Sequence, residues 1–165
     1  MKRKEEAIDA IKKLDICNQL SEYKPELCGT IPLGIDVSTS DLDIIMEVKD
    51  LTSFEDKIKL LYSDQPYFKI NRKIIRGKHV VKANFVYKGF EFELFGQDVP
   101  VHEQYAYLHM VIEKKILLKN PELKPKMISL KQRGYKTEPA FCKVLGIAGD
   151  PYEALIQYGK DQSYI

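Results

Sequence analysis

Cysteine is scarce in this sequence and follows no recognisable pattern. The three cysteines, Cys17, Cys28 and Cys142, are odd in number, and none belongs to a Cys-x-x-Cys pair. This spacing argues against a disulfide framework and against a zinc site built from paired cysteines. We expect small, buried thiols that stay reduced.

Long hydrophobic runs are also missing. No stretch approaches the roughly 20 apolar residues that a membrane span needs. The basic residues among positions 1–6 are not followed by the apolar segment that a secretory signal requires. The sequence therefore predicts a cytoplasmic protein with no membrane partner.

An excess of one charge sign is absent as well. Lys and Arg number 26 and Asp and Glu number 24, which leaves a net charge of +2. Such a small charge gives no indication of generic polyanion binding, and a DNA-binding domain typically has a more strongly basic face. The 165 residues, 44% of them hydrophobic, fit one domain with an ordinary core.

The spacing of apolar residues predicts helices at both ends of the chain and strands between them. Residues 52–55 match a capping box, and Lys88-Gly89 matches a hairpin turn. The expected helices are 4–20, 53–62 and 101–118, with further helix starts at Thr137 and Asp150, and the expected strands are 26–30, 42–48, 67–75, 79–87 and 90–95.

This order predicts an α+β fold, with a mixed β-sheet flanked by helices and a helical C-terminal part. We expect a single domain over residues 1–165. Its core would span about residues 3–98, and the helical part about residues 100–165.

Asp41 and Asp43 form the most informative pair in the chain. They are two positions apart at the start of a predicted strand, so their side chains point to the same face. Like charges held this close repel each other, and Mg²⁺ relieves the repulsion because it prefers carboxylate and phosphate oxygens. A third carboxylate on a neighbouring strand completes a two-metal site, which activates an attacking oxygen and stabilises a leaving pyrophosphate. The alternative is a solvated pair on an exposed strand.

Gly29-Thr30 lies upstream of this pair and suits a complementary task. Glycine lets the backbone approach a phosphate closely, while the threonine hydroxyl and backbone N–H groups can donate hydrogen bonds to it. The two motifs together favour a site for a nucleoside triphosphate (NTP) and a divalent metal ion.

The motif from Gly29 to Asp43 resembles that of the polymerase-β-type nucleotidyltransferase superfamily. An apolar residue, glycine and a small residue are followed by a ten-residue spacer and then by Asp-apolar-Asp-apolar. The resemblance covers about residues 3–96. It implies that Asp41 and Asp43 bind Mg²⁺ (or Mn²⁺) and that Gly29 and Thr30 hold the triphosphate.

The same resemblance extends to three further features. Gly34 and Ser40 match a second loop glycine and a serine before the first aspartate. The family's third metal-binding carboxylate lies on an apolar-acid-apolar strand, and both Glu91 and Glu93 match that pattern. Periodicity does not separate the two; we favour Glu93, because Glu91 is nearer the hairpin turn.

The whole chain also resembles a bacterial family of unknown function within this superfamily, which implies the fold and gives no substrate. The residues that carry this similarity are 92–97, Gln104, His109, Glu113, 136–141 and 149–152.

Tyr105, His109 and Glu113 are spaced at i, i+4 and i+8 on a predicted helix, with Gln104 beside them. Two interpretations are open. Gln104, His109 and Glu113 can contact a base or an acceptor, or His109 and Glu113 can simply pair along the helix. His102 is expected at the surface.

Lys136 precedes a predicted helix start, where anions bind readily. It can contact a phosphate, or the segment can be a plain helix cap. One basic cluster is also present, and one of its members can reach the triphosphate. The cluster consists of Lys69, Arg72, Lys73, Arg76, Lys78, His79 and Lys82.

The sequence thus supports a metal-dependent enzyme that moves a nucleoside monophosphate from an NTP to an unidentified acceptor. Two alternatives stay open. One is a non-catalytic module of the same fold that binds a nucleotide or a partner protein, as in a toxin–antitoxin-like pair. The other is an RNA-binding domain that uses the basic cluster, with an affinity that falls steeply with salt.

Overall fold

The computed structural model describes residues 2–165, which form two compact units. The first unit contains the chain up to Gly29 and residues Asp41–Glu103. The second contains Thr30–Ser40 and Gln104–Ile165. The predicted α+β class is confirmed, and the loop at residues 30–40 groups with the helical part of the chain.

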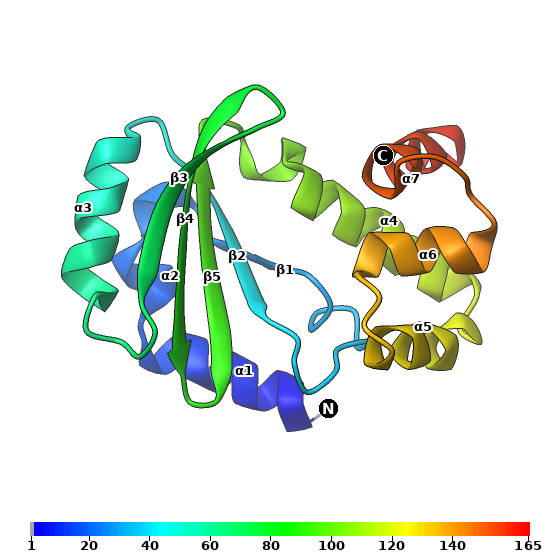
Figure 1. Ribbon diagram of the computed structural model, residues 1–165, viewed down its shortest axis with the longest axis horizontal. Coiled ribbons are helices and arrows are strands. Elements are labelled where there is room, and N and C mark those ends of the chain that lie inside the picture. Colours follow the sequence, from blue (N-terminus) through cyan, green and yellow to red (C-terminus); the bar gives the residue numbers. More distant parts are fainter. Residues whose placement is uncertain (1) are drawn as a thin grey trace. The chain divides into compact units, whose positions relative to one another are not determined.

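A five-stranded mixed sheet forms the first unit, with strand order β1-β2-β5-β4-β3 (Figure 1). Neighbouring β2 and β5 are parallel, whereas the other neighbours are antiparallel. The strands are β1 (Glu26–Cys28), β2 (Leu42–Glu47), β3 (Lys69–Ile75), β4 (Lys78–Tyr87) and β5 (Phe90–Gln97).

The two central parallel strands present an apolar face and a mixed face, because side chains alternate along each strand; the mixed face carries Ile45 and Phe95 beside the carboxylates. On the apolar face, Leu42 pairs with Phe92 and Ile44 with Leu94, and all four are buried. The opposite face, which we call the polar face, carries the carboxylates of both strands.

Three helices belong to the same unit: α1 (Lys2–Lys13), α2 (Ile16–Gln19) and α3 (Leu51–Tyr62). Tyr62 of α3 stacks on Phe85 of β4, with ring centroids 5.2 Å apart. A Cβ placed on Gly96 of β5 would lie 2.8 Å from the Phe54 ring of α3, so only glycine permits this close approach. The helices thereby bury the apolar face and leave the polar face for chemistry.

The expected helix at residues 4–20 is interrupted. Asp15 adopts a left-handed backbone conformation with φ 55°, which separates α1 from α2. The predicted capping box at residues 52–55 is wrong as well. Asp50 caps α3, and its Oδ1 accepts a hydrogen bond of 3.1 Å from the Ser53 N–H.

The predicted hairpin at residues 79–95 is confirmed. Lys88 and Gly89 both have positive φ, 49° and 77°, as the two-residue turn between β4 and β5 requires. The expected helix at 101–118 is divided into a short 3-10 helix, η2 (Val101–Glu103), and α4 (Tyr105–Lys119).

Four helices make up most of the second unit: α4, α5 (Leu123–Gln132), α6 (Thr137–Leu145) and α7 (Pro151–Asp161). The predicted helix starts at Thr137 and Asp150 are confirmed. The core of this unit includes Ile112, Met127, Phe141 and Leu155, and Ile35 of the loop joins it. Within residues 2–165, no helix has the length and apolar character that a membrane crossing would need.

Candidate functional site

A row of side chains crosses the polar face of the sheet. Cys28 of β1 is the cross-strand partner of Asp43 on β2, Asp43 is the partner of Glu93 on β5, and Glu93 is the partner of Asn84 on β4. We call these four residues the carboxylate row. Adjacent strands lie about 4.8 Å apart, so this register holds the Asp43 and Glu93 side chains next to each other.

Asp41 lies two residues before Asp43, immediately ahead of β2, and both side chains are half-buried. Glu93 is also half-buried, whereas Glu91 is exposed and pairs with Val86. The register therefore brings Glu93, and not Glu91, next to Asp43. A role for Glu93 as the third metal-binding carboxylate stays a prediction.

Gly29 borders the row because the chain turns sharply after β1. Its φ is +85°, a conformation that glycine adopts without penalty. A Cβ at this position would lie 2.7 Å from the Asp43 Oδ2 atom. Glycine therefore leaves space for the Asp43 carboxylate, in addition to any contact with a phosphate.

Lys82 provides the positive charge in this cluster. Its Nζ lies 2.6 Å from the Glu93 Oε1 atom, and both side chains are partly shielded from solvent. The hydrogen bond with Glu93 raises the pKa of Lys82, and the negative charges of Glu93, Asp43 and Asp41 raise it further. The Lys82 ammonium group thus interacts electrostatically with all three carboxylates.

The residues present fit a divalent cation in the type of donor atom they offer. Carboxylate oxygens are the ligands that Mg²⁺ prefers. Across residues 2–165, however, no group of three or more His, Cys, Asp or Glu side chains is arranged to hold a metal ion. The Lys82 ion pair gives a physical reason, because it engages the Glu93 carboxylate that a three-carboxylate site would use.

The remaining residues of the predicted triphosphate loop belong to the second unit. Thr30 is buried, with 7% of its surface exposed, and its carbonyl accepts hydrogen bonds from the N–H groups of Leu33 and Ile35. Ser40 closes a tight turn, since its Oγ accepts a hydrogen bond of 2.8 Å from the Val37 N–H. These contacts order the loop. A phosphate contact by Thr30 stays a prediction.

The predicted contact residues of α4 are buried within the second unit. The His109 imidazole Nε2 lies 2.9 Å from the Tyr152 carbonyl oxygen, and the Tyr105 hydroxyl donates a hydrogen bond of 2.8 Å to Glu153. Both contacts join α4 to α7. Gln104 is the N-cap residue of α4 and is 2% exposed. A role for these side chains toward a base or an acceptor stays a prediction.

Glu113 of α4 is almost completely buried, with 2% of its surface exposed. Its Oε2 atom is buried and has no hydrogen-bond partner among residues 2–165. Burial raises the pKa of Glu113 well above its ordinary value, and the charge of Glu138 and a hydrogen bond with it add to the rise. Lys131 acts in the opposite direction. Burial therefore favours the neutral form of the Glu113 carboxyl.

Lys136 is the N-cap residue of α6. Its side chain makes no capping hydrogen bond, while Lys131 donates one of 2.9 Å to the hydroxyl of the next residue, Thr137. The position at a helix start agrees with the prediction from the sequence. A phosphate contact by Lys136 stays a prediction.

The basic cluster is divided between the two faces of the sheet. Arg72 donates hydrogen bonds to Thr52 and Glu55 of α3, on the apolar face. Lys82 points to the polar face and contacts Glu93. The sequence predicted one basic residue near the triphosphate, and Lys82 is the member that lies beside the carboxylates.

Asn84 was not predicted from the sequence, and Lys82 was not singled out from its cluster. The hairpin turn contained the necessary signal. If Tyr87 and Phe90 flank the two-residue turn, the register places Asn84 opposite Glu93, and Lys82 two positions further along the same face.

Solved structures that are similar to this chain include two polymerases. The Cid1 poly(U) polymerase with MgGTP bound is 14% identical, with a TM-score of 0.58 over 79% of this chain and 42% of that chain. The GLD-2/RNP-8 complex is 14% identical, with a TM-score of 0.57 over 86% of this chain and 56% of that chain. The polymerase core of TRAMP, an RNA surveillance complex, is 10% identical, with a TM-score of 0.53 over 93% of this chain and 47% of that chain. The chain thus spans about half the length of these neighbours.

These likenesses, together with the mixed sheet, define a nucleotidyltransferase fold. At the level of sequence, residues 9–158 match one family model. The protein belongs to this family, which is described as a domain of unknown function (DUF4269). No curated protein matches the chain in sequence.

Replacing Gly29 with alanine tests the role of this glycine in placing Asp43. We expect Gly29→Ala to lower the free energy of unfolding by about 2–4 kcal/mol, because a strained φ and a steric clash act together. Gly77→Ala is the matched control, since Gly77 has φ +76° and a Cβ added there would meet nothing within 4 Å. Urea unfolding of both variants gives the difference, which we attribute to Asp43. Equal losses in the two variants would contradict this account.

The burial of Glu113 predicts an unusual pH dependence of stability. A carboxyl whose pKa is raised in the folded state stabilises the fold fully below its unfolded pKa, near 4.5, and this contribution declines as the pH rises above that value. The free energy of unfolding, measured with urea, should therefore fall between pH 5 and pH 8. Glu113→Gln should flatten the decline by at least about 1 kcal/mol. The exposed Glu103→Gln should keep the wild-type slope, and parallel curves for all three proteins would refute the assignment.

Proposed function

We propose that this protein is a metal-dependent nucleotidyltransferase, which transfers a nucleoside monophosphate from an NTP to an acceptor hydroxyl or phosphate. The observation that carries the proposal is the carboxylate row. Asp43 and Glu93 are cross-strand partners on two parallel central strands, and Asp41 lies two residues upstream of Asp43. Proteins with this fold include polymerases that use NTPs.

Each residue has a role in this proposal. Asp41 and Asp43 hold Mg²⁺ or Mn²⁺, and Gly29 with Thr30 binds the triphosphate. Lys136 is a further candidate for a phosphate contact, and Gln104, His109 and Glu113 are candidates for contact with the base or the acceptor. The bound metal ion would supply charge stabilisation for the phosphates and lower the proton affinity of the attacking oxygen.

The transfer step follows from these roles. The acceptor oxygen forms a bond with the α-phosphorus of the NTP, and the bond between that phosphorus and the bridging oxygen of the β-phosphate breaks. Pyrophosphate leaves with the electrons of the broken bond. Glu93 accepts the proton of the acceptor group. Lys82 positions the Glu93 carboxylate through its ion pair and balances part of the negative charge.

A non-catalytic module of the same fold is the second candidate. The ion pair between Lys82 and Glu93 favours it, because an engaged third carboxylate is less available for a metal ion or a proton. The chain also spans only about half the length of its structural neighbours. Such a module would bind an NTP or a partner protein without turnover.

A label-transfer assay separates the two candidates. The full chain is incubated with each NTP labelled at the α-phosphate, with Mg²⁺ or Mn²⁺, and with the RNA, protein and small-molecule fractions of a cell extract. We expect transfer of label to one fraction with release of pyrophosphate. Glu93→Gln should lower the rate by about 100-fold or more, since general-base groups contribute roughly 10²–10⁴-fold.

Glu91→Gln provides the matched control, because Glu91 lies on the same strand and is exposed. Its rate should stay within about twofold of the wild type. The absence of transfer with every NTP, or equal losses in the two variants, would reject the catalytic proposal. Retained NTP binding without transfer would then favour the non-catalytic module.

A further inference from the structure

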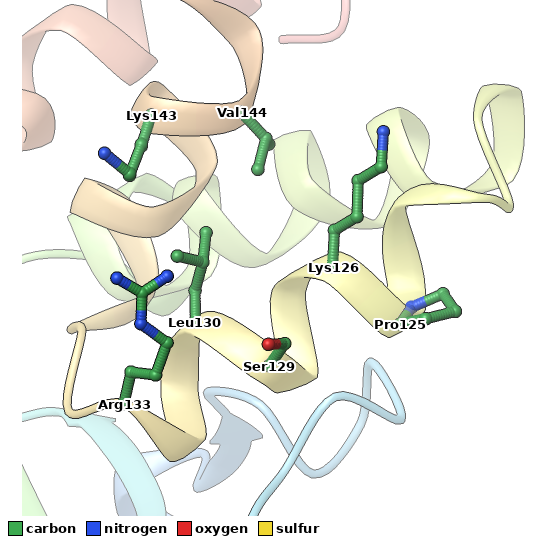
Figure 2. A pocket seen from close by; sticks show the side chains of 7 residues that line it. All are labelled: Pro125, Lys126, Ser129, Leu130, Arg133, Lys143 and Val144. Carbon is green, nitrogen blue, oxygen red and sulfur yellow. The ribbon is translucent and has the colours of Figure 1, made fainter.

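The second unit contains a surface pocket that the proposed reaction does not use. It has a volume of about 580 Å³, within the range of roughly 300–1,000 Å³ that is typical of small-molecule sites. Figure 2 shows the side chains that line it, which come from α5, from the C-cap residue of α5 and from α6. They are Pro125, Lys126, Ser129, Leu130, Arg133, Lys143 and Val144.

The α5 side of the pocket is one continuous helix face. Lys126, Ser129, Leu130 and Arg133 follow the spacing i, i+3, i+4 and i+7, which places them in a line along the helix. Leu130 is buried and, together with Val144 of α6, gives the pocket an apolar lining between polar groups. The pocket therefore combines an apolar surface with charged groups at its rim.

The charges around the pocket have one sign. Three of its lining residues are cations, and no carboxylate lines it among the described residues. The surrounding segment, residues 123–136, contains five basic residues and no acidic one, although the net charge of the whole chain is only +2. Lys126, Arg133 and Lys143 form no ion pair with any carboxylate of residues 2–165. An anion is the ligand that this arrangement favours.

The three cations are arranged asymmetrically. The Arg133 guanidinium carbon and the Lys143 Nζ lie 5.6 Å and 5.7 Å from the centre of the Tyr135 ring, and Figure 2 shows both residues at the same end of the pocket. Lys126 lies two turns away along α5, about 10 Å at 1.5 Å per residue, at the other end. Figure 2 shows Ser129 and Leu130 between the two ends.

We infer that this pocket binds a small organic phosphate, with the phosphate held by Arg133 and Lys143 and a second anionic group held by Lys126. Arginine suits the first task because its planar guanidinium donates paired hydrogen bonds to phosphate oxygens. Ser129 supplies a hydroxyl, and Leu130 with Val144 contacts the carbon skeleton. A single-stranded nucleic acid is disfavoured, because it is bound largely by base stacking, and the Tyr135 ring beside the pocket already has Arg133 and Lys143 against it.

Binding of fructose phosphates tests this inference on the full chain, with EDTA present to exclude divalent cations. Fructose 1,6-bisphosphate carries two phosphates at opposite ends and is the probe for both ends of the pocket. Fructose 6-phosphate probes one end, and unphosphorylated fructose is the blank. Dissociation constants come from titrations followed by amide chemical shifts, which also report whether α5 and α6 respond.

We expect the bisphosphate to bind at least about fivefold more tightly than the monophosphate, and fructose not to bind. The double variant Arg133→Gln/Lys143→Met should weaken both phosphates at least tenfold. Lys126→Met should instead bring the two affinities close to each other. Lys160→Met, an exposed residue of α7 outside the pocket, should leave all values unchanged.

Three results would overturn the inference. The first is the absence of binding by both phosphates. The second is equal binding by the wild type and the pocket variants, or loss of binding in Asp43→Asn, which would assign the phosphate to the carboxylate row. The third is binding of an oligouridylate, but of neither fructose phosphate, with an affinity that falls steeply with salt, which would identify a nucleic-acid surface. None of these results depends on the transfer assay.

Discussion

Repulsion between neighbouring carboxylates is the constraint on which the functional face of the first unit depends. The parallel register of β2 and β5 makes Asp43 and Glu93 direct cross-strand partners, and Asp41 adds a third negative charge nearby. Lys82 offsets this charge by an ion pair with Glu93. Gly29 leaves space for the Asp43 carboxylate where any other residue would place a Cβ. The proposed metal ion and the observed lysine are therefore two ways of balancing the same charges.

In the second unit, by contrast, two titratable side chains are buried in the helical interior. Glu113 lies in the helical interior, where burial raises its pKa and favours the neutral form of its carboxyl. His109 is buried too and is held by a backbone carbonyl of α7. A neutral carboxyl needs no counterion, so burial costs less than for a charged group. These buried groups fix the packing of the helices, while the exposed cations around the pocket remain available for a ligand.

Much of the arrangement of side chains on the polar face is predictable from the sequence, because the motif is local. The alternation of Asp41 and Asp43 at the start of an apolar strand indicated a shared face, and the hairpin turn at Lys88-Gly89 was recognised. The position of Lys82 beside the carboxylates is not predictable in this way, since it depends on which face of the sheet each basic residue takes. The break at Asp15 was missed because a left-handed residue leaves no mark in hydrophobic spacing. The sequence predicts that residues 30–40 belong to the sheet core, yet this loop groups with the helices through long-range contacts that no local pattern reveals.

The central claim is that Asp41 and the carboxylate row together bind an NTP and a divalent metal ion. Thermal unfolding with each NTP, with and without Mg²⁺, tests it most directly in the wild type and in Asp41→Asn/Asp43→Asn. A ligand at about 100 times its dissociation constant adds about 2.7 kcal/mol, which corresponds to roughly 2–4 °C per kcal/mol for a chain of this size. The account predicts a shift of several degrees that requires Mg²⁺ and disappears in the double variant. No shift with any NTP, or an equal shift in both proteins, would contradict it.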